Sequence, residues 1–163
     1  MKIYNIKDEY IAYLRQFDEK VAINKKESRP YVGIVLEIGT IKYYAPLSSP
    51  KPKHRKMKNG KDFRKIANGA FGAINFNNMI PVLASELILI DIDSIEDVQY
   101  RRLIQNQVIA IRADKDGIFR TAKELYALLL KDENTLTDFE KRIKERCCNV
   151  QLLEKVYTTF IMK

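Results

Sequence analysis

Residues 31–56 carry a β-hairpin pattern that runs directly into a proline-rich basic segment. Tyr31–Ile38 is rich in residues that favour strands, Gly39-Thr40 follows as a two-residue turn, and Ile41–Leu47 continues as the partner strand. Glycine at the first turn position suits a type II′ hairpin, whose twist matches that of the flanking strands. The basic segment therefore leaves the end of a hairpin, which is a firm mount for a functional site.

The basic segment holds nearly the whole net charge of the chain. Residues 51–65 contain eight cationic side chains and one acid, Asp62, for a local charge of +7, whereas all 163 residues together carry +8. A charge this concentrated predicts a polyanionic partner at a defined place. The alternative is a solvated loop that only keeps the protein soluble. The eight cations are Lys51, Lys53, Arg55, Lys56, Lys58, Lys61, Arg64 and Lys65.

Two features favour a binding site over a solvated loop. Prolines hold φ near about −65° and push the preceding residues to extended conformations, so this loop is stiff. The hydroxyls of Ser48 and Ser49 lie within it, as does His54, the single histidine of the sequence. Hydroxyls and cations in a rigid loop can bind a phosphate group. The prolines are Pro46, Pro50 and Pro52.

Length and composition are those of one globular domain, and we expect residues 1–163 to form a single unit. The sequence lacks an apolar run of about 18 residues, which excludes a transmembrane helix. Residues 1–8 lack the apolar core and cleavage site of a signal peptide. We therefore expect a cytoplasmic protein with no membrane partner.

Metal chemistry has little support in the sequence. The adjacent Cys147 and Cys148 form half a metal site at best, and no second Cys or His pair completes it. We expect both to be small buried residues. Asp91 and Asp93 would share one face of a strand and could bind Mg²⁺. The favoured alternative is that they end a strand just before a helix start, where carboxylates are stabilised.

The chain is strand-rich in its first half and helical in its second. Ser94 with Asp97, and Thr137 with Glu140, resemble capping boxes that begin helices. This order predicts an α+β fold, with helices packed on a curved sheet or small barrel. Further strands are expected at Lys2–Ile6, Ala73–Phe76, Ile80–Val82 and, as a central strand, Leu87–Ile92; helices are expected at Asp8–Phe17, from Ser94 to about Ala113, around Ala122–Leu129, from Thr137, and at Val150–Phe160.

Few constellations of nucleophile and base are present. Ser48-x-x-Lys51 formally matches the serine–lysine motif of penicillin-recognising enzymes, but their Ser-Asp-Asn and Lys-Thr-Gly motifs are absent. RNA can be cut without a metal or a protein nucleophile, because its 2′-hydroxyl attacks the neighbouring phosphorus. The protein must align the atoms, stabilise a dianionic transition state and help move two protons, which lysine, arginine and serine can do.

Three segments together resemble the ToxN/AbiQ family, the endoribonuclease toxins of type III toxin–antitoxin systems. They are residues 31–38, residues 43–54 with the specific Ala-Pro-Leu-Ser-Ser-Pro-Lys core, and residues 73–82. The resemblance covers the chain from Lys2 to Glu154. It implies a strongly bent antiparallel sheet or small barrel, similar to the MazF-like toxins and surrounded by helices, with a mainly helical C-terminal half.

The resemblance also implies an activity, partners and a biological role. The activity is sequence-selective, metal-independent RNA cleavage, often at adenine-rich sites, which leaves a 2′,3′-cyclic phosphate and a 5′-hydroxyl without a cofactor. Substrates are cellular and phage RNA. The inhibitor is a repeated antitoxin RNA, folded as pseudoknots, that the toxin cuts into units and with which it closes into an alternating protein–RNA assembly. The usual role is abortive phage infection.

The catalytic loop of the family maps onto Ser48, Ser49 and Lys51. Relatives often have threonine at the position of Ser48. The basic residue before the first hairpin strand is Arg29, where relatives have lysine; arginine transfers protons poorly, so we expect Arg29 to clamp the transition state. Lys25 stands where some relatives have tyrosine, and we expect it to bind RNA.

The remaining predicted RNA contacts come from the basic segment and one tyrosine. Tyr43 and Tyr44 are adjacent and point to opposite sheet faces, so one is expected in the core and the other, Tyr44, could stack on a base. Two alternatives stay open: an RNA-binding module without catalysis, and a structural ribonucleoprotein component. Besides Lys25 and Tyr44, the predicted RNA contacts are Lys53, His54, Arg55, Lys56, Lys58 and Lys61.

Overall fold

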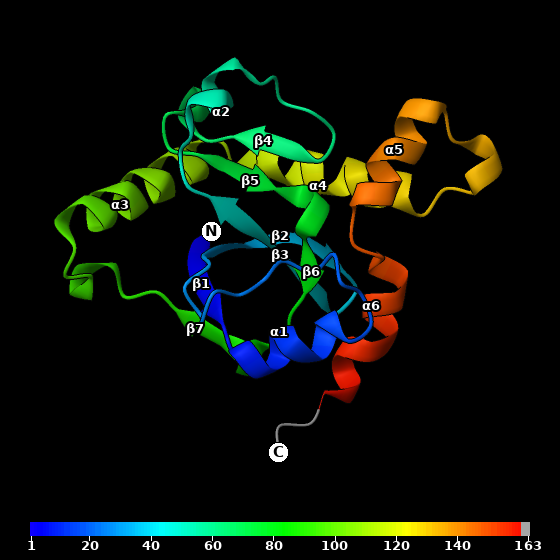
Figure 1. The fold of residues 1–163 in the computed structure, drawn as a ribbon, viewed down its shortest axis with the longest axis horizontal. Coiled ribbons are helices and arrows are strands. Elements are labelled where there is room, and N and C mark those ends of the chain that lie inside the picture. The colour runs from blue at the N-terminus through cyan, green and yellow to red at the C-terminus, as the bar shows by residue number, and fades with distance from the viewer. Residues whose placement is uncertain (161–163) are drawn as a thin grey trace.

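A bent antiparallel sheet lies at the centre of the molecule, with helices on both of its faces (Figure 1). The structure is a computed structural model and describes residues 1–160. The strand order is β4-β5-β3-β2-β1-β7, and the short β6 also pairs with β3. The strands are β1 (Lys2–Ile6), β2 (Tyr31–Ile38), β3 (Ile41–Ser48), β4 (Phe63–Lys65), β5 (Ala73–Asn75), β6 (Ile80–Pro81) and β7 (Leu87–Leu89).

The predicted hairpin is confirmed and forms the middle of this sheet. Ile38 pairs with Ile41 across the turn, where Gly39 has a φ of +59°, a conformation that glycine adopts without strain. The register shifts between Gly33 and Leu36, which marks a bulge in β2. On its other edge β3 pairs with β6 and then with β5, whose residue Ala73 lies opposite Ser48. The end of β3 is therefore held from both sides.

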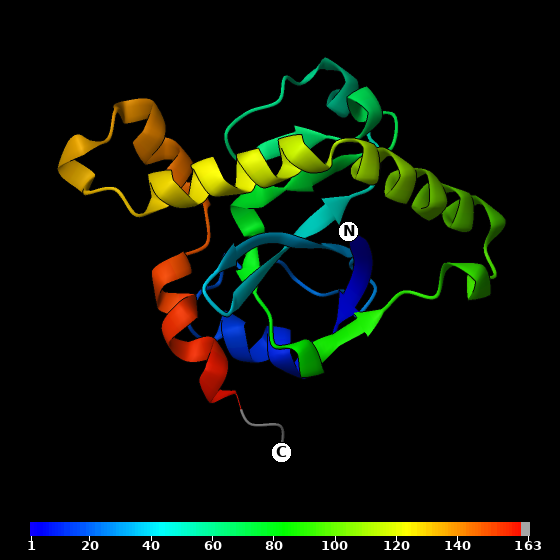
Figure 2. The ribbon, with the colours of Figure 1, turned by 180° about the vertical axis from the view of Figure 1, so that it is seen from behind.

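Helices bury both faces of the sheet. One core combines side chains of β2, β3 and β5 with α3 (Val98–Ala113), α4 (Lys115–Leu129) and α5 (Asp138–Arg146). The other combines the opposite face with α1 (Asp8–Arg15) and α6 (Val150–Val156). From behind, α3 and α4 run one after the other across the sheet (Figure 2). Because the side chains from Tyr43 to Leu47 are all buried, neither sheet face is open to solvent along this part of β3.

Several predicted elements are confirmed and others are corrected. Thr137 and Glu140 form the predicted capping box of α5, but α3 begins at Asp97, whose carboxylate accepts a hydrogen bond from the Tyr100 amide at 3.0 Å. Ser94 instead donates to the Asp91 carbonyl. The prediction of a central strand at Leu87–Ile92 is wrong, because β7 is a short edge strand with Leu89 55% exposed. An apolar run does not distinguish a central strand from an edge strand that is covered only partly.

The sheet is not closed. β4 and β7 stand at opposite ends of the strand order within residues 1–160, so the structure has the bent antiparallel sheet but not the barrel. Cys147 and Cys148 are buried and free, as expected. None of the helices in the described part of the chain is long and apolar enough to cross a membrane.

Candidate active site and nucleic-acid interface

A cavity of about 290 Å³ lies where the end of β3 meets α3. It brings together side chains from three distant stretches of the sequence: the loop before β2, the end of β3 with the residues after it, and one face of α3. Five predicted site residues line it, namely Lys25, Arg29, Ser48, Ser49 and Lys51. The α3 residues Tyr100, Leu103, Ile104 and Gln107 form its remaining wall.

Ser48 is fixed at the edge of the cavity by its neighbours on β5. It is half-buried, and its hydroxyl oxygen accepts a hydrogen bond from the side-chain amide of Asn75. Because that bond occupies an acceptor position, the hydroxyl proton stays available for donation. Gly72 lies against the Ser48 backbone with a φ of +90°. The Ser48 hydroxyl therefore has a fixed place and a donor to offer.

Ser49 and Lys51 are exposed and flank Pro50 at the start of a short helix, α2 (Pro52–Lys56). The basic segment is thus not a loop throughout, as its sequence predicted, but turns helical at Pro52. The Lys51 amide donates to Nδ1 of His54 at 3.2 Å, and the His54 amide donates to the Lys51 carbonyl at 2.9 Å. These reciprocal bonds fix the backbone of Lys51 while its ammonium group remains free to move.

His54 is only 2% exposed, so the structure leaves little of its side chain open for the predicted contact with RNA. Burial, with Lys53 and Lys51 nearby, lowers the pKa of His54 below its usual 6.5. Since Nδ1 accepts the Lys51 amide, the neutral ring carries its proton on Nε2. His54 therefore supports the loop that carries Lys51.

The loop before β2 is held by Asp8 in a conformation that costs backbone energy. Lys25, Lys26 and Glu27 all have positive φ, between 50° and 62°, which is unfavourable for residues other than glycine. The Asp8 carboxylate accepts bonds from the Glu27 amide and the Asn24 side chain. A loop fixed in this way places Lys25 in the cavity wall.

Arg29 completes the same wall. Its Nε donates to the Ile23 carbonyl at 2.8 Å, so one donor anchors the guanidinium at the cavity. A guanidinium offers five N–H donors in a planar fork, which suits a phosphate.

Most of the remaining basic residues are solvent-exposed, and two of them lie next to the cavity. A shallow depression on α2 is lined by Pro50, Lys51, Arg55 and Lys56, so Lys51 borders both it and the cavity. This continuity offers a nucleic-acid strand a cationic path away from the hydroxyls. Lys53, Lys58 and Lys61 are also exposed.

Two charges counted in the basic segment belong to ion pairs. The Arg64 guanidinium forms two bonds with the Asp114 carboxylate, at 2.5 and 2.7 Å. Arg146 forms two with Asp62, at 2.6 and 2.8 Å. These bidentate pairs join β4 to the helices, and they leave the lysines and Arg55 as the exposed charge of the segment.

The prediction that Tyr44 is open to a base is wrong, because both adjacent tyrosines are buried. Tyr44 is 3% exposed and packs edge-to-face with Tyr4, at 5.6 Å between ring centroids. Tyr43 is fully buried, and its hydroxyl donates to Glu154, which also accepts from Tyr126. Burial raises the pKa of Tyr44 to about 12. Helices cover both faces of the sheet, and so neither side of β3 faces solvent.

Sequence reasoning missed the α3 wall of the cavity. Gln107 shares the buried face of α3 with Ile104, Val108 and Ile111. A glutamine within an apolar helical stripe is a signal that sequence can provide, because buried polar groups need partners. Tyr100, one and a half to two turns earlier on the same helix, gives no comparable signal.

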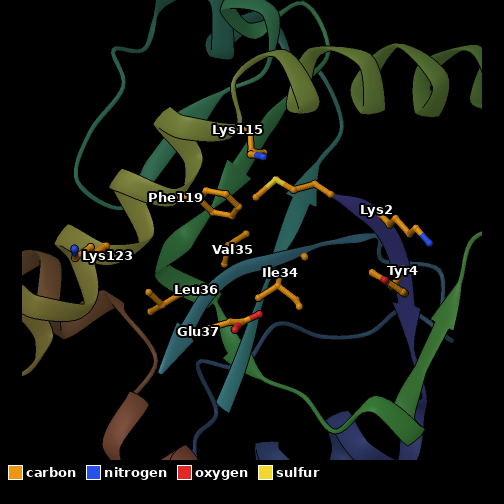
Figure 3. Close-up of a pocket in the computed structure, with 11 residues that line it drawn as sticks. Lys2, Tyr4, Ile34, Val35, Leu36, Glu37, Lys115, Phe119 and Lys123 are labelled. Atoms are coloured by element: carbon orange, nitrogen blue, oxygen red, sulfur yellow. The ribbon is translucent and has the colours of Figure 1, made fainter. Parts of the chain in front are cut away.

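A larger cavity, of about 570 Å³, lies between the β2 bulge and α4 (Figure 3). Its rim carries Lys2, Lys115 and Lys123, and the Lys115 ammonium lies 5.9 Å from the centroid of the Phe119 ring. It contains none of the predicted catalytic residues. We therefore place the candidate active site in the smaller cavity and regard this one as a second cationic surface.

Residues 1–160 contain no cluster of three or more His, Cys, Asp and Glu side chains that could hold a metal ion. Asp91 and Asp93 are both exposed and lie between β7 and α3, in agreement with the favoured interpretation that they follow a strand just before a helix start.

Comparisons with known proteins agree on one family. A family model described as toxin ToxN of a type III toxin–antitoxin system matches residues 2–158. Endoribonuclease ToxN of Pectobacterium atrosepticum is 35% identical over 170 residues, covering 98% of this chain and 94% of that protein. Endoribonuclease AbiQ of Lactococcus lactis is 32% identical over 137 residues, covering 77% and 74%.

Solved structures give the same result. One, from work on selective toxin inhibition by a non-coding RNA pseudoknot in type III systems, has a TM-score of 0.84 at 30% identity and covers 97% of this chain and 96% of that one. Another, of the lactococcal anti-phage endoribonuclease AbiQ, has a TM-score of 0.79 at 28% identity and the same coverage.

Proposed function

The chain belongs to the ToxN family of type III toxin–antitoxin systems, and from this premise we propose that it is an endoribonuclease toxin acting in abortive infection. The observation that carries the proposal is the convergence of three serines (Ser28, Ser48 and Ser49) and three cations in one small cavity. A site with this composition matches the needs of RNA cleavage, which are positioning, charge stabilisation and proton transfer. We further propose that the protein acts in the cytoplasm and that its bent sheet is related to that of the MazF-like toxins.

The proposed reaction is an internal transesterification. The 2′-oxygen of the substrate bonds to the adjacent phosphorus, the bond from phosphorus to the 5′-oxygen breaks, and the products are a 2′,3′-cyclic phosphate and a 5′-hydroxyl. One proton leaves the 2′-hydroxyl and one reaches the 5′-oxygen. Because RNA supplies its own nucleophile, the mechanism asks the protein for no covalent intermediate and is proposed to need no metal.

The geometry of the cavity supports a proposed role for each of these residues. Ser49 is exposed beside Ser48 and positions the 2′-hydroxyl or a phosphate oxygen. Ser48, which can donate its proton, bonds a second phosphate oxygen. Lys51 transfers a proton or stabilises charge, and Arg29 clamps the dianionic transition state. Lys25 lines the same wall and contacts the RNA backbone.

The proposed partners are substrate RNA, from the cell or a phage, and an antitoxin RNA folded into pseudoknot units. A structural relative was obtained in work on inhibition by such an RNA. We also propose a closed assembly of alternating toxin and RNA. Each protein in such an assembly must contact two RNA units, and the second cationic surface around Lys115 and Lys123 suits the second contact.

The alternative is an RNA-binding module without catalysis, which the same exposed lysines would serve. One experiment separates the two: the pure protein is incubated with RNA in EDTA, beside the same RNA carrying a 2′-O-methyl group at the cut site. The proposal expects cleavage of the first and none of the second. Cleavage of the methylated RNA would contradict the mechanism, and cleavage of neither would favour the binding module.

A further inference from the structure

Gln107 belongs to the wall of the candidate active site and carries an unused hydrogen-bond acceptor. Its side chain is 2% exposed and lines the cavity that holds Ser48 and Ser49. Its Oε1 atom is buried and has no hydrogen-bond partner in the described residues. Buried acceptors are rarely left alone, because the lost hydration is not replaced. A group bound in the cavity can supply the missing donor.

The orientation of the Gln107 amide is set by its other contact. Its Nε2 donates to the carbonyl oxygen of Phe71 at 2.9 Å. A carbonyl accepts hydrogen bonds and cannot donate them, so the reversed amide would bring two oxygens together. The –NH₂ group is therefore committed to Phe71, and Oε1 is the atom left for a ligand. Gln107 can therefore recognise a hydrogen-bond donor of a ligand, but not an acceptor.

We propose that the α3 wall is a nucleobase subsite and that Gln107 determines its specificity by accepting a hydrogen bond from an exocyclic amine. The preferred base next to the cut is then adenine, cytosine or guanine, whereas uracil has no such amine. This inference rests on the proposed ribonuclease function, because it takes the ligand of the cavity to be RNA.

The rest of the wall suits a base. Tyr100 lies at the same cavity and is 36% exposed, so an aromatic ring is available for stacking. Leu103 and Ile104 add apolar surface. A cavity of about 290 Å³ is small beside pockets for drug-sized ligands and suits one base. Base recognition beside Ser48 and Ser49 would place one particular phosphate at the hydroxyls.

The test removes the amine from the RNA and the acceptor from the protein. The cut sites of the wild type are first mapped on RNA with a randomised segment. Each base within two nucleotides of the preferred cut is then replaced by its analogue without the amine: purine riboside for adenosine, zebularine for cytidine, inosine for guanosine. At one position the replacement should slow the wild type roughly tenfold to a hundredfold, as the loss of one buried hydrogen bond implies.

Gln107→Met should cut both RNAs at nearly the same, lower rate. The matched control is Gln105→Met, an exposed glutamine on the same helix, which should discriminate like the wild type. If no replacement slows the wild type more than about threefold, or if Gln107→Met discriminates as the wild type does, the proposal is overturned. The comparison of RNAs with and without the amine uses only the wild-type protein, so it tests the proposal even if Gln107→Met fails to fold.

The ribonuclease function and the nucleobase subsite can be contradicted separately. If the wild type cuts no RNA, the proposed function fails, and equilibrium binding then tests the subsite with short single-stranded RNAs made of one base or of its analogue without the amine. An affinity ratio below about threefold for all three pairs overturns it. If the wild type cuts but shows no dependence on the amine, the function stands and only the role of Gln107 is lost.

Discussion

A Cβ atom on Gly72 would lie 1.9 Å from the carbonyl oxygen of Ser48. Gly72 also has a φ of +90°, which residues with a side chain rarely adopt. No other residue type fits this position without moving the end of β3, and with it the Ser48 hydroxyl. The backbone approach between β5 and β3 is therefore part of the active-site geometry.

Gly72→Ala should lower both stability and activity. We expect a loss of about 2–3 kcal/mol in the free energy of unfolding, because strain at positive φ adds to the clash. The cleavage rate should fall further than the folded fraction does. Gly60→Ala is the control, since the nearest atom to its added Cβ is 3.9 Å away. Urea unfolding measures the loss of stability, and single-turnover cleavage measures the loss of activity. Equal losses in Gly72→Ala and Gly60→Ala would contradict the close approach of Gly72 to Ser48.

Ser49→Ala should abolish toxicity and slow RNA cleavage by at least about a hundredfold, the usual effect of removing a group that acts in the transition state. Fold and RNA affinity should change little, because Ser49 is exposed and small. Growth arrest on expression, cleavage of purified RNA and equilibrium binding provide the three measurements. Thr158→Ala, which removes an exposed hydroxyl outside the cavity, should resemble the wild type. If Ser49→Ala cleaves RNA at the wild-type rate, Ser49 is not part of the active site.

Mild acid should destabilise the protein through His54. The pKa of His54 is lowered by burial and by two nearby lysines, so the unfolded chain, with a pKa near the usual 6.5, binds the proton more readily. The contribution of His54 to stability is full above that value and is lost as the pH falls through the lower pKa of the folded state. Protonation of Nδ1 would also break its bond with the Lys51 amide.

Thermal unfolding of wild type and His54→Gln between pH 5 and 8 checks this. The variant should lose part of the dependence on pH below about 6.5, the ordinary pKa of histidine. Identical pH profiles for the two proteins would mean that His54 does not titrate as its surroundings imply.

Neutralising Lys53 and Lys56 together should reduce the salt dependence of RNA binding. Each lost contact to a single-strand phosphate lowers the slope of log affinity against log salt by roughly 0.7, so two give roughly 1.4. Lys141 and Lys155 are exposed on other helices and serve as the control pair. Lys144 is unsuitable, because it pairs with Glu133 at 3.4 Å. RNA-binding titrations at three salt concentrations give these slopes. Equal slopes for both double variants would mean that Lys53 and Lys56 do not contact RNA phosphates.

Charge reversal of Lys115 and Lys123 should separate assembly from cleavage. If the surface in Figure 3 binds a second RNA unit, the double Glu variant should cut short RNA at the wild-type rate but form a smaller complex with antitoxin RNA. Light scattering of the purified complex measures its mass. A complex of unchanged mass would place the second contact elsewhere.

Local patterns predicted much of the fold. The bounds of β1 and β2, the turn at Gly39 and the capping box of α5 all follow from sequence, because each depends on neighbouring residues. The position of β7 does not, because an apolar run has the same composition whether other strands flank it on one side or on both. Burial of Tyr44 was missed for a related reason: the sequence does not show that α1 and α6 cover that face.

The part of the site whose residues are close together in the sequence was predictable, whereas the part contributed by distant residues was not. Ser48, Ser49 and Lys51 lie within four residues, and the structure brings them together with Arg29. Gln107 follows them by more than fifty residues, and only the packing of α3 shows that it faces the same cavity. The burial of His54 depends on the helical turn after Pro52, which the proline pattern led us to expect as an extended loop.

Because α3 supplies one wall of the cavity, the order of synthesis has a consequence for when the site can form. A growing chain that has emerged from the ribosome only as far as β7 already carries the hydroxyls, yet it lacks Tyr100 and Gln107. The helices that bury one sheet face are then missing too, so Ser48 has no stable position. The complete cavity therefore comes into existence only after α3 has been synthesised and has packed against the end of β3.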